Sequence, residues 1–411
     1  MKKSFSYMFM SMLLALPLLL SCGEDRTHEY LEMTEENQWT YSTMEDVYLW
    51  AGEMNAPDRK SFFGTTSKFF SSLLVKKDKV SFFTDSVSEG SYGFKFSLVR
   101  DPLGEVMSRY YALVLYVEPG SPAHSAGIRR GTWISGIDGK NLNSSSGKQL
   151  QSGAAAMFAT SIIDYDDENE KYFWVQGDTL SMQHSVALES RAIFMDTLLD
   201  MRSGKTGYLV CRNMNGTSFA DDVQKTMLGF AAADVADIII DLRYCSEGTI
   251  ENAATLASIL VPQTLNGNLF ATLKGKGDDV IYNYAEQPVN LSDKRLFFII
   301  GNETKGIAEL LVESVNASRG MHDVIIVGTK SAGANVLTRN YMSPFGFSIN
   351  PAVAVIQASD GEDLQAEGIA PDYPLNELEE GKYVYPLGNR QEYILRNLEY
   401  FIINGFMPQE Q

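Results

Sequence analysis

Residues Glu118 to Leu142 read EPGSPAHSAGIRRGTWISGIDGKNL. Pro119-Gly120 predicts a turn, which is followed by a short helix from Ser121 to Ala126 and by Gly127, which ends that helix. Asp138-Gly139 is typical of a tight turn between two antiparallel strands. The stretch therefore predicts a turn, a short helix and a β-hairpin in a fixed order.

The sequence before this stretch favours strands. Phe94 to Leu98 and Leu113 to Val117 are short segments typical of β-structure. Together with the turn, helix and hairpin, they make residues 87–188 resemble a PDZ domain. In PDZ domains an apolar-Gly-apolar loop directs backbone N–H groups at a peptide's terminal carboxylate, and the next strand pairs with that peptide.

This resemblance implies a set of peptide-binding residues and a class of partner. The partners are peptide or protein C-termini. The residues that match the loop and the strand are Tyr92, Gly93, Phe94, Lys95 and Phe96. The alternative is that the chain's own elements cover this strand edge.

The C-terminal part, residues 189–411, alternates apolar strands with helical segments. The predicted strands are Gly207 to Cys211, Asp237 to Leu242, Leu296 to Gly301 and Val324 to Gly328. The predicted helices between them are Ile250 to Val261 and Ile307 to Ser318. This order indicates an α/β core with a mixed sheet and flanking helices.

Two segments precede the β-rich part. In residues 38–86, aromatic and aliphatic residues recur every three or four positions, which predicts a small N-terminal helical unit. Residues 22–37 are polar and lack apolar periodicity, so we expect an unfolded tether there.

The N-terminus is typical of an exported lipoprotein. Lys2 and Lys3 precede an apolar run from Met8 to Leu20 that is too short to span a bilayer, so residues 1–21 predict a signal peptide. Leu19-Leu20-Ser21-Cys22 resembles a bacterial lipobox, in which Cys22 receives the lipid. We expect a lipid anchor in the outer membrane, with the protein facing the periplasm or the medium.

Charge and cysteine content exclude several other classes. The chain carries 34 Lys and Arg against 52 Asp and Glu, and its net charge of −18 repels nucleic acid and anionic head groups. Membrane contact is therefore expected through the lipid anchor only. Cys211 and Cys245 lack zinc-site spacing, so we expect buried thiols, with a disulfide between them as the alternative. No metal or other cofactor is expected.

The order of lipobox, helical unit, PDZ-like unit and α/β unit resembles the C-terminal processing (tail-specific) peptidases, a family of serine peptidases. Four short motifs carry the resemblance further: Gly207-Tyr208-Leu209, Asp237 to Arg243, Val327 to Lys330 and Glu367 to Asp372. In this family a Ser hydroxyl attacks a peptide carbonyl, and a Lys kept neutral by burial accepts its proton.

Both catalytic positions depart from the family pattern. The family's Ser opens a Ser-Ala-Ser-Glu sequence at a strand-to-helix turn, and alignment on Glu309 places Gly306 at that nucleophile position. The family's Lys ends a Gly-x-x-Thr-x-Gly-Lys pattern, and the matching stretch from Gly328 places Ala334 at the general-base position. The resemblance thus implies that neither catalytic residue is intact.

A third departure follows Asp241-Leu242-Arg243. The family continues with an Asn and glycines whose backbone N–H groups approach the oxyanion, whereas this chain has Tyr244-Cys245-Ser246-Glu247-Gly248. We expect this bulky, acidic loop to hinder that approach. Because loss of one catalytic partner typically lowers turnover about a million-fold, the sequence favours a binding protein without peptidase activity.

Two other functions stay open. One is an active serine-type endopeptidase with a displaced nucleophile. Its candidate residues are Thr304 or Ser331 with Lys305 or Lys330 as base, and Cys245 as a thiol nucleophile. The other is a protein that binds an apolar small ligand, by analogy with retinoid-binding relatives of the fold.

Overall fold

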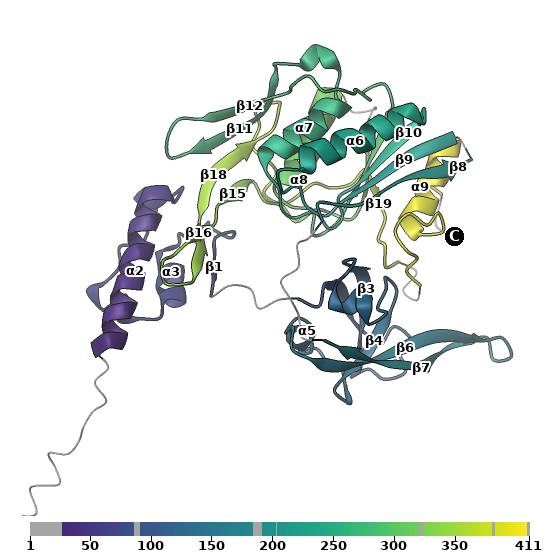
Figure 1. The fold of residues 1–411 in the computed structure, drawn as a ribbon, viewed down its shortest axis with the longest axis horizontal. Helices are drawn as coiled ribbons and strands as arrows, with labels where there is room; N and C mark the ends of the chain where they lie inside the picture. Colours follow the sequence, from purple (N-terminus) through teal and green to yellow (C-terminus); the bar gives the residue numbers. More distant parts are fainter. Residues whose placement is uncertain are drawn as a thin grey trace, which may run out of the picture. The chain divides into compact units, whose positions relative to one another are not determined.

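The computed structural model describes residues 27–85, 91–183, 191–202, 204–319, 324–379 and 383–408 (Figure 1). The chain divides into two compact units, Met1–Val87 with Thr338–Val353 and Ser88–Leu337 with Ala354–Gln411. The expected signal peptide and Cys22 lie outside the described residues. Within the described part of the chain, no helix has both the length and the apolar composition that crossing a bilayer requires.

The first unit is mainly helical, which confirms the prediction from aromatic spacing. Its helices are α2 (Thr27–Val47), η2 (Ala51–Glu53), η3 (Arg59–Phe63) and α3 (Thr66–Leu73). Its three strands, β1 (Phe82–Thr84), β16 (Tyr341–Met342) and β17 (Ser348–Asn350), pair in the order β1-β17-β16. Tyr48, Phe69 and Phe70 are buried in the core of this unit.

The expectation of an unfolded tether is wrong for residues 27–37, because α2 begins at Thr27. Polar contacts hold this part of the helix. The Glu36 carboxylate accepts a hydrogen bond from the Thr66 hydroxyl, and the Asn37 amide donates to the Phe62 and Gly64 carbonyls. The partners lie 25 to 30 positions along the chain, so the local pattern gives no sign of them.

Residues 91–183 form the β-rich part of the second unit. Its elements are β2 (Phe94–Arg100), β3 (Tyr110–Val117), α4 (Pro122–Ser125), β4 (Trp133–Ile137), β5 (Lys140–Asn141), α5 (Gly147–Leu150), β6 (Ala156–Asp166) and β7 (Lys171–Met182). The sheet order is β2-β3-β4-β6-β7, with β5 paired to β4. The turn predictions are confirmed, since Ser121 caps α4 and both Asp138 and Gly139 have positive φ, 49° and 75°.

The α/β part of the same unit is built on a second six-stranded sheet. Its strands are β8 (Ile193–Met201), β9 (Gly204–Cys211), β10 (Asp237–Asp241), β13 (Arg295–Ile300), β14 (Val324–Gly328) and β19 (Tyr373–Pro374). They are ordered β19-β14-β13-β10-β9-β8, with β8 antiparallel to β9 and the other pairs parallel. The predicted mixed sheet with flanking helices is confirmed.

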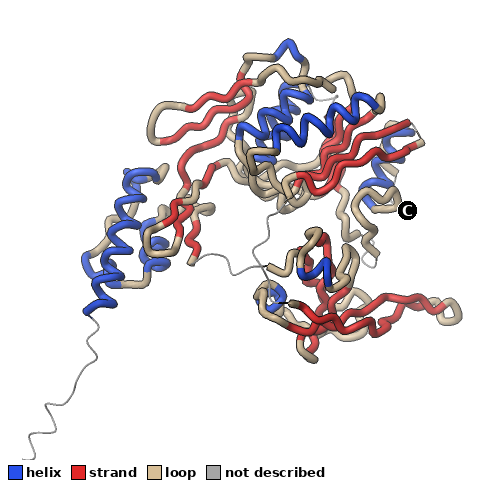
Figure 2. Tube along the Cα trace, viewed as in Figure 1, coloured by secondary structure: helices blue, strands red, loops and turns tan. Residues whose placement is uncertain are grey.

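Both faces of this sheet are buried, as expected for a strand such as β10, in which all five residues are buried and the central three are isoleucines. Its helices are α6 (Phe219–Ala232), α7 (Ile250–Leu260), α8 (Ile307–Arg319) and α9 (Tyr393–Asn404). Ile238 and Ile240 pack with α6, α7 and α8, whereas Ile239 packs with α9. The helices α6, α7 and α8 lie on one side of this sheet, and α9 lies on the other (Figure 2). Successive strand residues point to opposite faces, so one isoleucine run serves two cores.

A four-stranded sheet completes the second unit. It has the order β12-β11-β18-β15 and comprises β11 (Leu269–Gly275), β12 (Val280–Asn283), β15 (Val336–Thr338) and β18 (Ala352–Gln357). The short helix η4 (Gln263–Leu265) precedes β11.

Candidate active site

The turn between β13 and α8 is fixed by a buried threonine. The Thr304 hydroxyl accepts a hydrogen bond from the Gly301 N–H and donates one to the Leu242 carbonyl, both at 2.8 Å. Gly301 has no room for a side chain, because a Cβ there would lie 2.8 Å from the Arg243 carbonyl oxygen. The end of β10 and the start of α8 are thus joined tightly.

Gly306 and Ala334, far apart in sequence, lie side by side at this turn. A Cβ on Gly306 would lie 4.0 Å from the Cβ of Ala334, which is itself buried. Gly306 has a φ of +57°, in the left-handed region that favours glycine. Neither residue carries a side-chain oxygen or nitrogen, so this pair can neither attack a carbonyl nor accept a proton.

The buried Glu309 carboxylate connects the two turns. Its Oε2 accepts hydrogen bonds from the backbone N–H groups of Gly306 (2.8 Å) and Ala334 (2.9 Å). Its Oε1 accepts from the Gly333 N–H (2.7 Å) and from the Ser331 hydroxyl. With these four bonds, Glu309 holds positions 306 and 334 in place.

A second contact locks the turn that carries Ala334. A Cβ on Gly333 would lie 2.6 Å from the Gly368 nitrogen, and a Cβ on Gly368 would lie 2.3 Å from the Ser331 carbonyl oxygen. Close backbone packing of this kind needs glycine at both positions. The Gly-Ile-Ala-Pro-Asp stretch therefore serves the geometry of this turn.

The hydroxyls of the alternative nucleophiles are already engaged. Thr304 is fully buried with both bonds described above, and Ser331 donates to Glu309 while accepting from the Ile369 N–H at 2.6 Å. Lys305 and Lys330 are exposed, and the Lys330 ammonium lies 4.0 Å from the Glu367 carboxylate. The structure therefore does not assemble a hydroxyl and a buried amine from these four residues.

Both cysteines outside the signal region are free, buried thiols, as expected, and they form no disulfide. Burial raises the pKa of the Cys245 thiol to about 12. At neutral pH almost none of it is thiolate, the form that acts as nucleophile. Cys245 is therefore a poor candidate for catalysis.

The loop after β10 differs from the expected obstruction. Tyr244 is buried, and its hydroxyl hydrogen-bonds to Glu377 and to Arg130 instead of facing the turn at Gly306. Glu247 is exposed and its carboxylate accepts from the Asn215 amide at 3.1 Å. Only the exposed half of the loop keeps the acidic character that the sequence suggested.

A buried ionic network, which sequence analysis did not predict, lies beside this loop. Arg243 contacts Asp241 (2.8 Å), Glu377 (3.1 Å) and Glu392 (2.7 Å), and Arg130 of the β-rich part contacts Glu377 at 2.7 Å. Burial alone would raise the pKa of Glu377, but the charges of Arg130 and Arg243 outweigh it and hold that pKa below its ordinary value. The network ties the β-rich part to the α/β sheet.

The five expected peptide-binding residues lie at one end of the β-rich sheet. Phe94, Lys95 and Phe96 belong to β2, the terminal strand of that sheet, and Gly93 has a φ of +77°. The Gly93 N–H bonds to the Ser91 hydroxyl, so this donor is not directed outward. Tyr92 is buried and donates to the Ala154 carbonyl.

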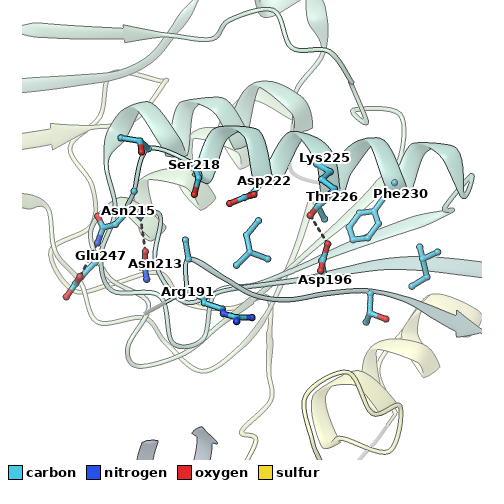
Figure 3. A pocket seen from close by; sticks show the side chains of 17 residues that line it. Arg191, Asp196, Asn213, Asn215, Ser218, Asp222, Lys225, Thr226, Phe230 and Glu247 are labelled. Atoms are coloured by element: carbon cyan, nitrogen blue, oxygen red, sulfur yellow. Dashed lines mark hydrogen bonds between the residues drawn. The ribbon is translucent and has the colours of Figure 1, made fainter. Parts of the chain in front are cut away.

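A large groove among the described residues lies elsewhere. It has a volume of about 1180 Å³ and runs between β8 and α6 as far as Glu247 (Figure 3). Gly306 and Ala334 do not line it. In the described part of the chain, no group of three or more His, Cys, Asp and Glu side chains is arranged to hold a metal ion.

The mixed sheet, its flanking helices and the helical N-terminal unit define a peptidase-like fold. Residues 205–375 match the model of peptidase family S41, and residues 35–84 match the model of the peptidase S41 N-terminal domain. The two S41 models together match more than half of the chain, which therefore belongs to peptidase family S41.

Solved structures share this fold over most of the chain. A protein from Bacteroides fragilis assigned to the S41 proteases has a TM-score of 0.77 and 23% identity, with 90% of this chain and 98% of that chain covered. The photosystem II D1 C-terminal processing protease has a TM-score of 0.53 and 16% identity, covering 89% and 97%. No curated protein sequence matches.

Proposed function

We propose that this chain is an exported lipoprotein of family S41 that lacks peptidase activity and acts by binding peptides or proteins. The observation that carries the proposal is the pair Gly306 and Ala334, whose Cβ positions would be 4.0 Å apart and which offer no reacting atom. The engaged hydroxyls of Thr304 and Ser331 and the high pKa of Cys245 argue against a displaced nucleophile.

The binding part of the proposal rests on the β-rich part, which we interpret as a PDZ-like domain over residues 87–188. We assign residues 38–86 to the N-terminal helical domain and 189–411 to the peptidase-like domain. A terminal strand such as β2 offers unpaired backbone groups to an extended peptide. The Gly93 N–H is already engaged by Ser91, so it does not serve the peptide's terminal carboxylate. We assign that carboxylate to the ammonium group of Lys95 on β2. The same ammonium group pairs with Glu303 at 2.5 Å.

Lipidation at Cys22 would hold the domains at the outer membrane, in the periplasm or at the cell surface. The Leu19-Leu20-Ser21-Cys22 sequence supports this location.

Labelling of the purified lipoprotein with a fluorophosphonate probe, together with a fluorogenic peptide assay, tests the loss of activity. We expect neither an adduct nor turnover in the natural chain. The matched variant Gly306→Ser/Ala334→Lys restores both functional groups, and we expect it to gain labelling at position 306. An adduct on Thr304, Ser331 or Cys245 of the natural chain would show a displaced active site instead.

Binding is tested with peptides that carry a free C-terminal carboxylate and with their amidated counterparts. We expect the free acids to bind more tightly. Lys95→Glu should weaken their binding because it places two carboxylates together with Glu303. Lys140→Glu, an equal charge change on exposed β5, is the matched control and should have no effect. Equal binding of acids and amides would contradict the assignment.

A further inference from the structure

A long groove separates the last strand of the α/β sheet from the helix beside it. The β8 side contributes Ile193, Asp196, Thr197 and Leu198, and the helix side contributes residues of α6 from Asp222 to Phe230. One hydrogen bond, from the Thr226 hydroxyl to the Asp196 carboxylate (2.8 Å), links the two walls (Figure 3). We call this the β8–α6 groove.

The floor of the groove is a free strand edge. β8 ends the sheet order and pairs with β9 on one side only, and within the described residues no strand pairs with its other side. In an antiparallel pair every second residue directs its N–H and C=O away from the partner strand. Ile193, Asp196, Thr197 and Leu198 line the groove, and the pairing of β8 with β9 is regular from Met195 to Met201, after a bulge between Ile193 and Met195. An extended backbone can therefore bond to the free edge in the regular part of β8.

The glycine in the middle of α6 has no packing reason that the structure shows. A Cβ on Gly229 would meet no atom within 4 Å, and a glycine in a helix interior is less stable than alanine. Gly229 lines the groove, so a larger side chain would project into it. At Gly229 the helix therefore gives up stability at a position where a side chain would narrow the space above β8.

The two ends of the groove differ in chemistry. Leu198, 40% exposed, lies with Gly229 and Phe230 at one end. Asp196 and Lys225 lie near Phe230, whereas Glu247 lies at the other end (Figure 3). With Asp222 and Arg191, the groove has three carboxylates against two cations. This excess of negative charge, in a chain of net charge −18, favours a basic occupant.

We propose that the β8–α6 groove binds an extended, basic segment of a partner protein, which adds to β8 as a further strand. An aliphatic side chain of the segment lies against Leu198 and Phe230, and its Lys or Arg side chains face Asp222 and Glu247. This site is separate from the β2 edge and does not depend on peptide binding there.

A displayed library of random peptides, selected on the full chain, tests the proposal. Gly229→Trp fills the groove, and Gly229→Ala is the matched control that keeps it open. Leu198→Arg is a second variant at an exposed position, where the fold tolerates the change. We expect the selected peptides to contain basic residues and an aliphatic residue. Their affinity should fall about tenfold or more for Gly229→Trp and for Leu198→Arg, and should stay unchanged for Gly229→Ala.

Amide exchange locates the bound peptide. Slower exchange in residues 193–198 on binding supports the proposal. Three results would overturn it: no selected peptide that loses affinity for both groove variants, selected peptides that are acidic, or protection at Phe94–Arg100 instead of β8. The last result would assign peptide binding to the β2 edge alone and leave the proposed function intact.

Discussion

Replacing Glu309 by Gln should destabilise the junction between the two turns at Gly306 and Ala334. The carboxylate accepts four hydrogen bonds, and an amide offers only one acceptor oxygen. At least one backbone N–H then faces an NH₂ group, and the remaining bonds lose their charge. With about 1.5–3 kcal/mol for each hydrogen bond to a charged group, we expect a loss of about 3–5 kcal/mol.

Urea unfolding and amide exchange measure this effect. The matched control is Glu313→Gln, one helical turn further along α8, where one carboxylate oxygen is buried without a hydrogen-bond partner among the described residues. We expect Glu309→Gln to speed exchange in residues 301–310 and 328–335, and Glu313→Gln to leave both segments unchanged. A loss below about 1 kcal/mol for Glu309→Gln, or equal losses for the two variants, would refute the reasoning.

Three further predictions concern buried groups. The Cys245 thiol, with a pKa of about 12, should react with iodoacetamide about a thousand-fold more slowly in the native than in the unfolded protein, as peptide mass spectrometry can measure. Arg130→Ala leaves Glu377 buried with one cation fewer and should cost about 3–5 kcal/mol in urea unfolding, whereas Arg129→Ala, at an exposed neighbour, should cost less than about 1 kcal/mol. Burial raises the pKa of Glu313 to about 7, and the charges of Glu309 and Asp360 act in the same direction. The hydrogen bond from the Gln365 backbone lowers this pKa but does not outweigh them. The folded protein therefore favours the neutral carboxyl of Glu313. Its contribution to the free energy of unfolding is fully present below pH 4.5 and is lost as the pH rises through 7. Glu313→Gln should stabilise the protein by about 1 kcal/mol at pH 8, after allowance for partial exposure, and by nothing at pH 4; a gain that is larger at pH 4 would contradict this sign.

The sequence predicted the elements whose signals are local. The isoleucines of β10 form a short buried run between turn residues, so the strand could be placed to within one residue. Gly306 and Ala334 were chosen from the resemblance to the C-terminal processing peptidases, the first by alignment on Glu309 and the second by the stretch from Gly328. The structure brings the two positions together. The strand needed only a local pattern, whereas this pair needed the family pattern as well.

What the sequence did not predict depends on contacts between distant positions. Arg243 meets Glu377 and Glu392, which lie 134 and 149 positions away. The three residues of β1 pair with β17, more than 260 positions further along, and are too few to show a strand period. The β8–α6 groove was missed for the same reason, since a strand edge is free only when the whole sheet order is known.

The fold around positions 306 and 334 does not depend on a serine or a lysine at either position. A serine at position 306 would need the left-handed φ of +57°, which strains any residue with a Cβ. A lysine at position 334 would place an amine where the present side chain is only 3% exposed, so its charged form would be poorly solvated. Glycine at position 306 and alanine at position 334 therefore avoid the backbone strain and the desolvation cost that a serine and a lysine would bring there. The groups that hold the turns, namely Thr304, Glu309 and Gly333, make the hydrogen bonds and close backbone contacts on which folding depends. If the chain binds peptides without cleaving them, as we propose, stability favours glycine and alanine at the two positions and still requires the scaffold around them.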